Sequence, residues 1–93
     1  MRANKKKFIY LISPNKIYKK FFNDIQKVLE TEKISFFQLR LKKYSFKHKV
    51  LIGQKIKNIC KKNKVKLLIN DDTIVAKRLG ADGCHLGQKD TNI

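Results

Sequence analysis

Short apolar runs alternate along the chain with segments whose apolar residues have helical spacing. Continuous apolar runs at 8–13 (FIYLIS), 34–40 (ISFFQLR) and 65–70 (VKLLIN) are typical of strands buried on both faces of a sheet. A shorter run at 81–86 predicts a fourth strand. The pattern therefore predicts four strands separated by three helical segments.

The helical segments between these runs carry apolar residues on one face and Lys, Asn, Asp or Gln between them. The third segment, about 73–79, is short. The apolar positions of the first two are Ile17, Phe21, Ile25 and Val28, and then Ile52, Ile56, Ile59 and Cys60.

Three residues mark the ends of the helices. Ser45 and Asp72 carry the short side-chain acceptors that suit a helix N-cap, and Gly80 suits a left-handed C-terminal cap. The resulting order βαβαβαβ predicts a single α/β domain over 1–93, with parallel strands and right-handed crossovers. No GxGxxG follows the first strand, which disfavours a dinucleotide-binding fold.

The charge of the chain is strongly positive and unevenly distributed. It has 23 Lys and Arg against seven Asp and Glu, a formal net charge of +16. The lysines are scattered over helices and turns, which favours a solvated basic surface over a dedicated polyanion site. A basic nucleic-acid-binding protein stays an alternative, although no aromatic RNA-binding motif or zinc finger is present. Four of the seven acids lie between Asp71 and Asp90.

The two cysteines, Cys60 and Cys84, have apolar neighbours and no metal-binding spacing. We expect them to be small buried hydrophobic residues, as in a reducing compartment. No run approaches the roughly 20 apolar residues of a membrane span. The expected location is the cytoplasm, with no membrane partner.

Polar clusters follow three of the strands. Gln38, Arg40 and Lys42 are spaced two apart, which places their side chains on one side of the second strand. The clusters 70–72 (NDD) and 87–90 (GQKD) directly follow the third and fourth strands. Sites of parallel α/β folds form at this end of the sheet.

The chemistry of the clusters is complementary. The cations Arg40 and Lys42 suit phosphate oxygens, and the amides Gln38 and Asn70 suit the edge of a heterocycle. The carboxylates Asp71 and Asp90 suit Mg²⁺, which binds one or two carboxylates together with waters and phosphates.

The same segments resemble the signature segments of the thiamine-phosphate synthase family. They are 38–42 (QLRLK), 68–71 (LIND) and 80–90 (GADGCHLGQKD), and 10–14 (YLISP) is similar to the family's first strand. The resemblance runs from about Tyr10 to Asp90 and covers the first half of the family's barrel. It implies the N-terminal half of a (β/α)₈ TIM barrel.

The resemblance also implies a reaction, in which hydroxymethylpyrimidine diphosphate is joined to thiazole phosphate and diphosphate is released. Mg²⁺ would be the cofactor, and no acid, base or nucleophile is assigned. The family often has an acidic residue where this chain has Leu41. On strand alternation the Leu41 side chain points away from the site, so we expect this difference to affect packing. The implied contacts to the pyrimidine diphosphate are Gln38, Leu39, Arg40, Leu41, Lys42 and Asn70, and the implied metal ligands are Asp71 and Asp90.

Three alternatives accompany this interpretation. A thiazole tautomerase relative shares the fold and part of the pattern, but the presence of Asp71 and Asp90 together with Gln38, Arg40 and Lys42 favours the synthase. A second alternative is that the chain is a catalytically inactive fragment, since the thiazole phosphate pocket belongs to the second half of the barrel. A complementary half-barrel chain, or a second copy of this chain, would supply the missing half.

Overall fold

The computed structural model describes residues 9–86. It contains four strands and three helices in the expected order, with bounds β1 Tyr10–Ile12, α1 Phe21–Thr31, β2 Phe36–Leu39, α2 Phe46–Lys62, β3 Lys66–Asn70, α3 Thr73–Leu79 and β4 Gly83–His85. None of these helices is long and apolar enough to cross a membrane.

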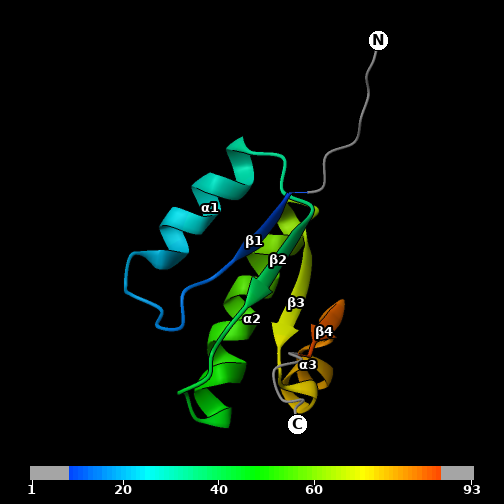
Figure 1. Cartoon of the computed structure of the whole chain (residues 1–93). Helices are drawn as coiled ribbons and strands as arrows, with labels where there is room; N and C mark the ends of the chain where they lie inside the picture. The colour runs from blue at the N-terminus through cyan, green and yellow to red at the C-terminus, as the bar shows by residue number, and fades with distance from the viewer. Residues whose placement is uncertain (1–8, 87–93) are drawn as a thin grey trace, which may run out of the picture.

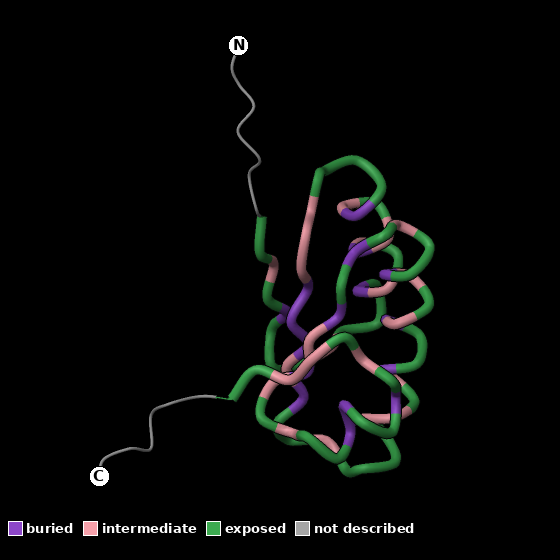
Figure 2. Tube along the Cα trace, turned by 90° about the vertical axis from the view of Figure 1, so that its right-hand side faces the viewer, coloured by how far each residue is buried: buried purple, intermediate pink, exposed green. Residues whose placement is uncertain are grey.

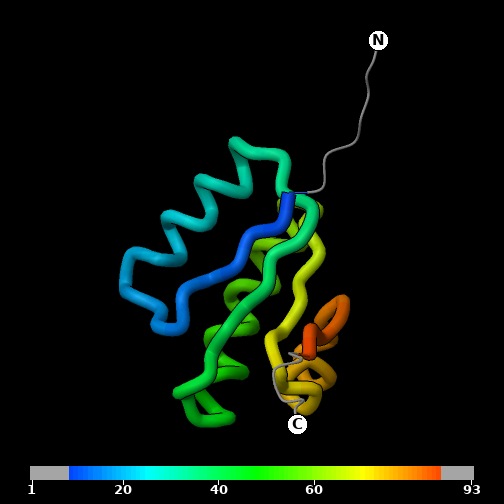
Figure 3. The backbone as a smooth tube through the Cα atoms, viewed as in Figure 1, coloured from blue at the N-terminus to red at the C-terminus, as the bar shows by residue number. Residues whose placement is uncertain are grey.

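The four strands form one parallel sheet in chain order, β1-β2-β3-β4 (Figure 1). In the register, Ile12 lies opposite Gln38, Gln38 opposite Leu68, and Leu68 opposite Gly83. The path of the backbone returns through a helix after each of the first three strands (Figure 3). All carboxyl ends of the strands therefore meet at one edge of the sheet.

The helices pack against one face of this sheet. Figure 2 shows the helical coils on one side of the strands, with buried segments between them. Phe37, Leu67 and Ile56 are at most 1% exposed and lie in this layer, where they form the core with residues of all three helices. The other face has no helix over it among residues 9–86, and its β1 side chains Tyr10 and Ile12 are 45% and 52% exposed.

The expected helix caps are confirmed. Ser45 Oγ accepts a hydrogen bond from the His48 N–H at 3.2 Å, and Asp72 Oδ1 accepts one from the Val75 N–H at 3.0 Å. Gly80 ends α3 in the left-handed region, with φ of 69°. These caps are local in sequence, and α3 consequently has the predicted bounds.

The strands are shorter than the predicted apolar runs, and two boundaries change the interpretation. Helix α1 begins at Phe21, four residues after Ile17, and its N-cap Lys20 makes no side-chain cap hydrogen bond. Strand β2 ends at Leu39, so Arg40 and Lys42 follow the strand and do not belong to it. Strand alternation therefore does not direct the Lys42 side chain.

Candidate functional site

Polar side chains meet where β2 and β3 end. Gln38 is 3% exposed, and its Oε1 accepts a hydrogen bond from Asn70 Nδ2 at 2.7 Å. On its other side, Gln38 Nε2 donates to the Tyr10 hydroxyl at 3.3 Å. The structure thus brings together the two amides that the sequence predicts at a ligand.

Arg40 lies directly beyond the end of β2. Its backbone N–H donates to Ser13 Oγ at 2.9 Å, and the Ser13 N–H donates to the Gln38 carbonyl at 2.9 Å. The end of β1 therefore fixes the backbone that carries Arg40. Two atoms, Arg40 Nε and Asn70 Oδ1, are buried and have no hydrogen-bond partner among residues 9–86.

Lys42 and Asp71 lie on neighbouring loops at the same edge. The distance from Lys42 Nζ to Asp71 Oδ2 is 4.0 Å, and both side chains are partly exposed. Asp71 has a left-handed backbone with φ of 54°, and its N–H donates to the His85 carbonyl at 2.8 Å. Pairing with the end of β4 therefore fixes the loop that presents this carboxylate.

The adjacent Asp72 has a structural role. Lys49 Nζ donates to its Oδ2 at 2.8 Å, while its Oδ1 caps α3. Burial alone would raise the pKa of Asp72, but hydrogen bonds from Lys49 and from the Val75 and Ile74 N–H groups lower the pKa below its ordinary value.

A hollow of about 190 Å³ opens beside these groups. It reaches Lys42, Asn70 and Asp71 and has an apolar wall of Leu41, Ile69 and Val75. Its dimensions are those of a small part of a ligand rather than of a whole drug-sized molecule.

Two of the predicted contact residues have buried apolar side chains. Leu39 and Leu41 are 0% and 5% exposed and their side chains belong to the hydrophobic core. Leu41 is buried, as predicted, although it lies beyond the end of β2, and it also lines the hollow. The 87–90 cluster, including the predicted metal ligand Asp90, lies outside the described residues. Within residues 9–86, no three His, Cys, Asp or Glu side chains come together as a metal-binding group.

Tyr10, Ser13 and Lys49 are contacts that sequence reasoning missed. Each makes a hydrogen bond to a residue distant in sequence: Tyr10 to Gln38, Ser13 to the Arg40 backbone, and Lys49 to Asp72. The resemblance gives Tyr10 a place on the first strand, but its contact with Gln38 also depends on the pairing of β1 with β2.

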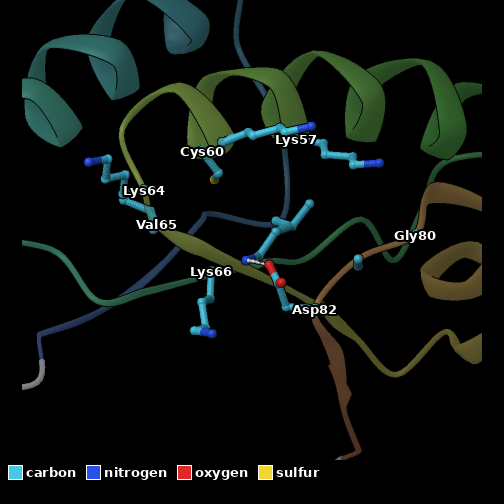
Figure 4. Close-up of a pocket in the computed structure, with 10 residues that line it drawn as sticks. Lys57, Cys60, Lys64, Val65, Lys66, Gly80 and Asp82 are labelled. Atoms are coloured by element: carbon cyan, nitrogen blue, oxygen red, sulfur yellow. Dashed lines mark hydrogen bonds between the residues drawn. The ribbon is translucent and has the colours of Figure 1, made fainter.

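A larger hollow of about 470 Å³ lies near the start of β3, away from these groups. Four lysines line it, but Figure 4 shows Lys57, Lys64 and Lys66 extending in different directions. Lys57 Nζ donates to the Leu79 carbonyl at 2.8 Å, and Asp82 Oδ2 accepts from the Leu67 N–H at 2.7 Å. These charges support the ends of α3 and β3 and do not converge on a common point.

Cys60, in the wall of this hollow, is 1% exposed. Burial and, to a smaller extent, the charge of Asp82 raise the pKa of Cys60 to about 12. The thiol is therefore protonated at neutral pH and is a core residue, as expected.

These features define a parallel βα protein that gathers cationic, amide and carboxylate groups at the carboxyl ends of its strands, as barrel enzymes do. Residues 9–93 match the family described as thiamine monophosphate synthase. The chain belongs to that family.

Individual relatives agree with this assignment. The thiamine-phosphate synthase of Pelagibacter ubique (strain HTCC1062) is 62% identical over 96 aligned residues, which cover 100% of this chain and 46% of the relative. That of Campylobacter jejuni (serotype O:23/36, strain 81-176) is 34% identical over 87 residues, covering 91% of this chain and 41% of the relative. The chain thus spans less than half the length of these relatives.

A solved structure supports the fold. Thiamine phosphate pyrophosphorylase from Pyrococcus furiosus superposes with a TM-score of 0.78 at 21% identity, over 91% of this chain and 41% of that one. The four parallel strands and their helices therefore form the N-terminal half of a TIM-barrel fold, as predicted.

Proposed function

We propose that this chain forms the part of a thiamine-phosphate synthase that binds hydroxymethylpyrimidine diphosphate. The observation that carries the proposal is the pair of buried polar atoms without a partner in residues 9–86, Arg40 Nε and Asn70 Oδ1. A buried donor or acceptor that lacks a partner costs about 1–3 kcal/mol. A bound ligand with phosphate oxygens and a polar ring would provide partners for both atoms.

The arrangement suits the departure of a diphosphate. In the proposed reaction, the bond between the pyrimidine methylene carbon and the diphosphate oxygen breaks, and its electron pair leaves with the diphosphate. The thiazole nitrogen then forms a new bond to that carbon. Arg40 and Lys42 would hold the phosphate oxygens and stabilise the charge that grows on them.

The proposal includes a magnesium ion at the same edge of the sheet. Asp71 offers a partly exposed carboxylate close to Lys42, and hard oxygen donors are the ligands that Mg²⁺ prefers. Bound Mg²⁺ would supply further neutralisation of the diphosphate charge. Asp71 would hold the ion, and Asp90 is proposed as a second ligand on sequence grounds alone.

The proposal includes a partner for the open face of the sheet. Parallel sheets are covered on both faces in nearly all folds, yet only one face is covered by helices in residues 9–86. We propose that the remaining strands of a barrel cover the face that carries Tyr10, Ile12 and Gln38. The site for thiazole phosphate would lie in that part, so turnover requires it.

Titration calorimetry of the 93-residue chain tests the binding function. Hydroxymethylpyrimidine diphosphate is expected to bind, and more tightly with Mg²⁺ than without it. Arg40→Ala removes hydrogen bonds of a charged group to phosphate and is expected to weaken binding by roughly 10- to 100-fold. Asp71→Asn is expected to abolish the effect of Mg²⁺.

Two substitutions of the same kind are controls. Lys43→Ala removes an exposed cation next to Lys42, and Asp24→Asn removes a carboxylate that bonds the Tyr18 hydroxyl in another part of the molecule. Both are expected to bind like the unaltered chain. Absence of binding by a folded chain, or equal losses in Arg40→Ala and Lys43→Ala, would contradict the proposal.

A further inference from the structure

The loop between β3 and α3 consists of Asp71 and Asp72, and both have irregular backbone. Asp71 is left-handed, with φ of 54°, and Asp72 has φ of −136° and ψ of 89°. A left-handed backbone at a residue other than glycine costs free energy and persists where the surrounding structure fixes it. The contacts on either side of Asp71 therefore decide where its carboxylate lies.

Strand pairing holds the backbone that enters this loop. Asn70 lies opposite His85 in the register of β3 and β4, and the Asp71 N–H donates to the His85 carbonyl at 2.8 Å. These contacts precede the Asp71 side chain along the chain. The backbone that leaves the loop needs an anchor of its own.

Asp72 is that anchor, and two helices hold it. Its Oδ1 accepts from the Val75 N–H of α3 at 3.0 Å, and its Oδ2 accepts from Lys49 Nζ at 2.8 Å. Lys49 belongs to α2, where its own N–H donates to the Ser45 carbonyl at 2.8 Å. Lys49 therefore ties the exit of the loop to a second helix.

This tie joins elements whose separation is fixed by packing. Gly53 of α2 faces Leu79 of α3, whose side chain leaves no room for a Cβ on Gly53. The Lys49 and Asp72 side chains are 19% and 24% exposed, so solvent screens the pair less than it screens a pair on the open surface. The contact consequently holds the loop at a set distance from α2.

We propose that Lys49 is a positioning residue, which holds Asp72 and thereby keeps the Asp71 carboxylate where the site takes a divalent cation. This inference rests on the proposed function and adds to it a residue of α2. Asn70, Asp71 and Asp72 line the same hollow, and their oxygens are hard donors of the kind that Mg²⁺ prefers. Loss of a residue that orients a metal ligand from outside the metal's own contacts typically costs about 10- to 100-fold in metal affinity.

The sign of the effect separates positioning from charge alone. A lysine beside a cation site repels the cation, so loss of its charge alone would raise the affinity for Mg²⁺. If Lys49 holds the carboxylate in place, its loss lowers that affinity instead.

Titration calorimetry of the 93-residue chain with hydroxymethylpyrimidine diphosphate, over a series of Mg²⁺ concentrations, measures this sign. Lys49→Met keeps the length and the apolar part of the side chain and removes the ammonium group. It is expected to raise the Mg²⁺ concentration that gives half of the gain in binding by roughly 10-fold. Affinity for the diphosphate without Mg²⁺ is expected to stay within about 3-fold, because Lys49 is engaged by Asp72 and not by the ligand.

Three further variants test the route through Asp72. Lys49→Arg keeps a cationic donor and is expected to restore most of the affinity for Mg²⁺, whereas Lys47→Met, at an exposed lysine of the same helix, is expected to behave like the unaltered chain. Asp72→Ser keeps an oxygen that caps α3 and removes the acceptor of Lys49. Combined with Lys49→Met, it is expected to cost no more than the larger single loss, because both changes remove one contact.

The remaining outcomes separate this inference from the function on which it rests. Unchanged or raised affinity for Mg²⁺ in Lys49→Met would overturn the inference, and so would an equal loss with and without Mg²⁺, which would make Lys49 a direct contact of the diphosphate. If Mg²⁺ has no effect on the unaltered chain, the inference fails although diphosphate binding stands. If the unaltered chain does not bind the diphosphate at all, the proposed function fails as well.

Amide hydrogen exchange of the free protein completes the test. The Asp71 N–H is expected to exchange faster in Lys49→Met than in the unaltered chain and in Lys47→Met, while the N–H groups of β2 keep their rates. Unchanged exchange at Asp71 would show that Lys49 does not hold the loop. Faster exchange throughout the sheet would show a general loss of stability, and either result would overturn the inference.

Discussion

Asp72 shows how a carboxylate in the wall of the hollow can also stabilise the fold. Its two oxygens join the start of α3 to Lys49 of α2, and the loop between β3 and α3 carries Asp71. Both partners of the ion pair are less than a quarter exposed, so solvent screens the pair less than a typical surface pair. The two contacts make separate contributions, because one is a cap and the other is a charge interaction.

Replacement of Asp72 separates these contributions. Asp72→Ala is expected to lower the free energy of unfolding by about 1 kcal/mol through loss of the cap, while Asp72→Asn keeps a capping side chain and loses only the charge. The folded-state pKa lies below the ordinary 3.8, so the charge stabilises the fold fully above that value. This stability is lost as the pH falls through the folded-state pKa.

Urea unfolding at pH 7 and in acid measures the effect. The difference between Asp72→Asn and the unaltered chain is expected at pH 7 and should shrink below pH 3.8. A difference that is the same at both pH values would show that the charge of Asp72 is not its cause.

Several residues of the site could be predicted from their types and their places at strand ends. Gln38 and Asn70 meet because neighbouring parallel strands end at the same edge. The Tyr10 and Ser13 contacts could not be predicted from local pattern, because they depend on the register between β1 and β2. The Leu39 side chain lies in the core because it alternates with Gln38 on β2, and Leu41 is buried just beyond the end of that strand.

At the scale of elements, helix ends that carry capping residues could be predicted from the sequence, and ends without them could not. Helix α3 has capping residues at both ends, and its predicted and observed bounds agree. Helix α1 has no capping side chain at its start, and apolar spacing alone placed that start four residues too early. Strand ends depend on pairing with neighbouring strands, so the apolar runs overestimated their lengths.

Gly80 tests the role of local chemistry at the end of α3. Its φ of 69° is unfavourable for a residue with a Cβ, and a Cβ there would come no closer than 3.4 Å to Lys57 Nζ. Gly80→Ala is therefore expected to destabilise the fold by roughly 1 kcal/mol through backbone strain and not through a clash.

Gly80→Asn is the matched comparison, since asparagine tolerates the left-handed region better than alanine. Thermal and urea unfolding followed by circular dichroism should rank the unaltered chain first, then Gly80→Asn, then Gly80→Ala. Equal stability of all three proteins would contradict the strain argument.

At the scale of the whole molecule, the described residues form a two-layer arrangement with one uncovered sheet face. The apolar runs predicted strands buried on both faces, and the pattern is correct for a strand in a complete barrel. In residues 9–86 the second layer is absent, which leaves Ile12 52% exposed on that face. The net charge of +16 adds repulsion between copies and does not explain this face.

A charged residue on the open face is expected to block its partner. Ile12→Lys should prevent association with the remaining half of the barrel, supplied as the corresponding portion of the Pelagibacter ubique relative. Leu51→Lys is the control, because Leu51 is 56% exposed on α2, away from this face. Sedimentation velocity measures the complex.

Two results of that experiment show whether the open sheet face is covered by a second copy of the chain or by the other half of the barrel. If the chain associates with itself, and Ile12→Lys abolishes this association, a second copy covers the face. If association with the other half is equal in Ile12→Lys and Leu51→Lys, the open face is not the interface and the proposal is wrong.

The left-handed backbone of Asp71 has a consequence for how this site can be lost. An Asp with φ of 54° carries strain of about 1 kcal/mol, which glycine would relieve while adding a similar entropy to the unfolded chain. Folding therefore exerts little selection for a carboxylate at this position. A copy of the gene released from its function could lose Asp71 without loss of a stable product, so surveys of protein stability or abundance would not detect the change. Under the proposed function, Asp71 is kept for its part in binding the ligand, so an assay of binding is the measurement that would detect its loss.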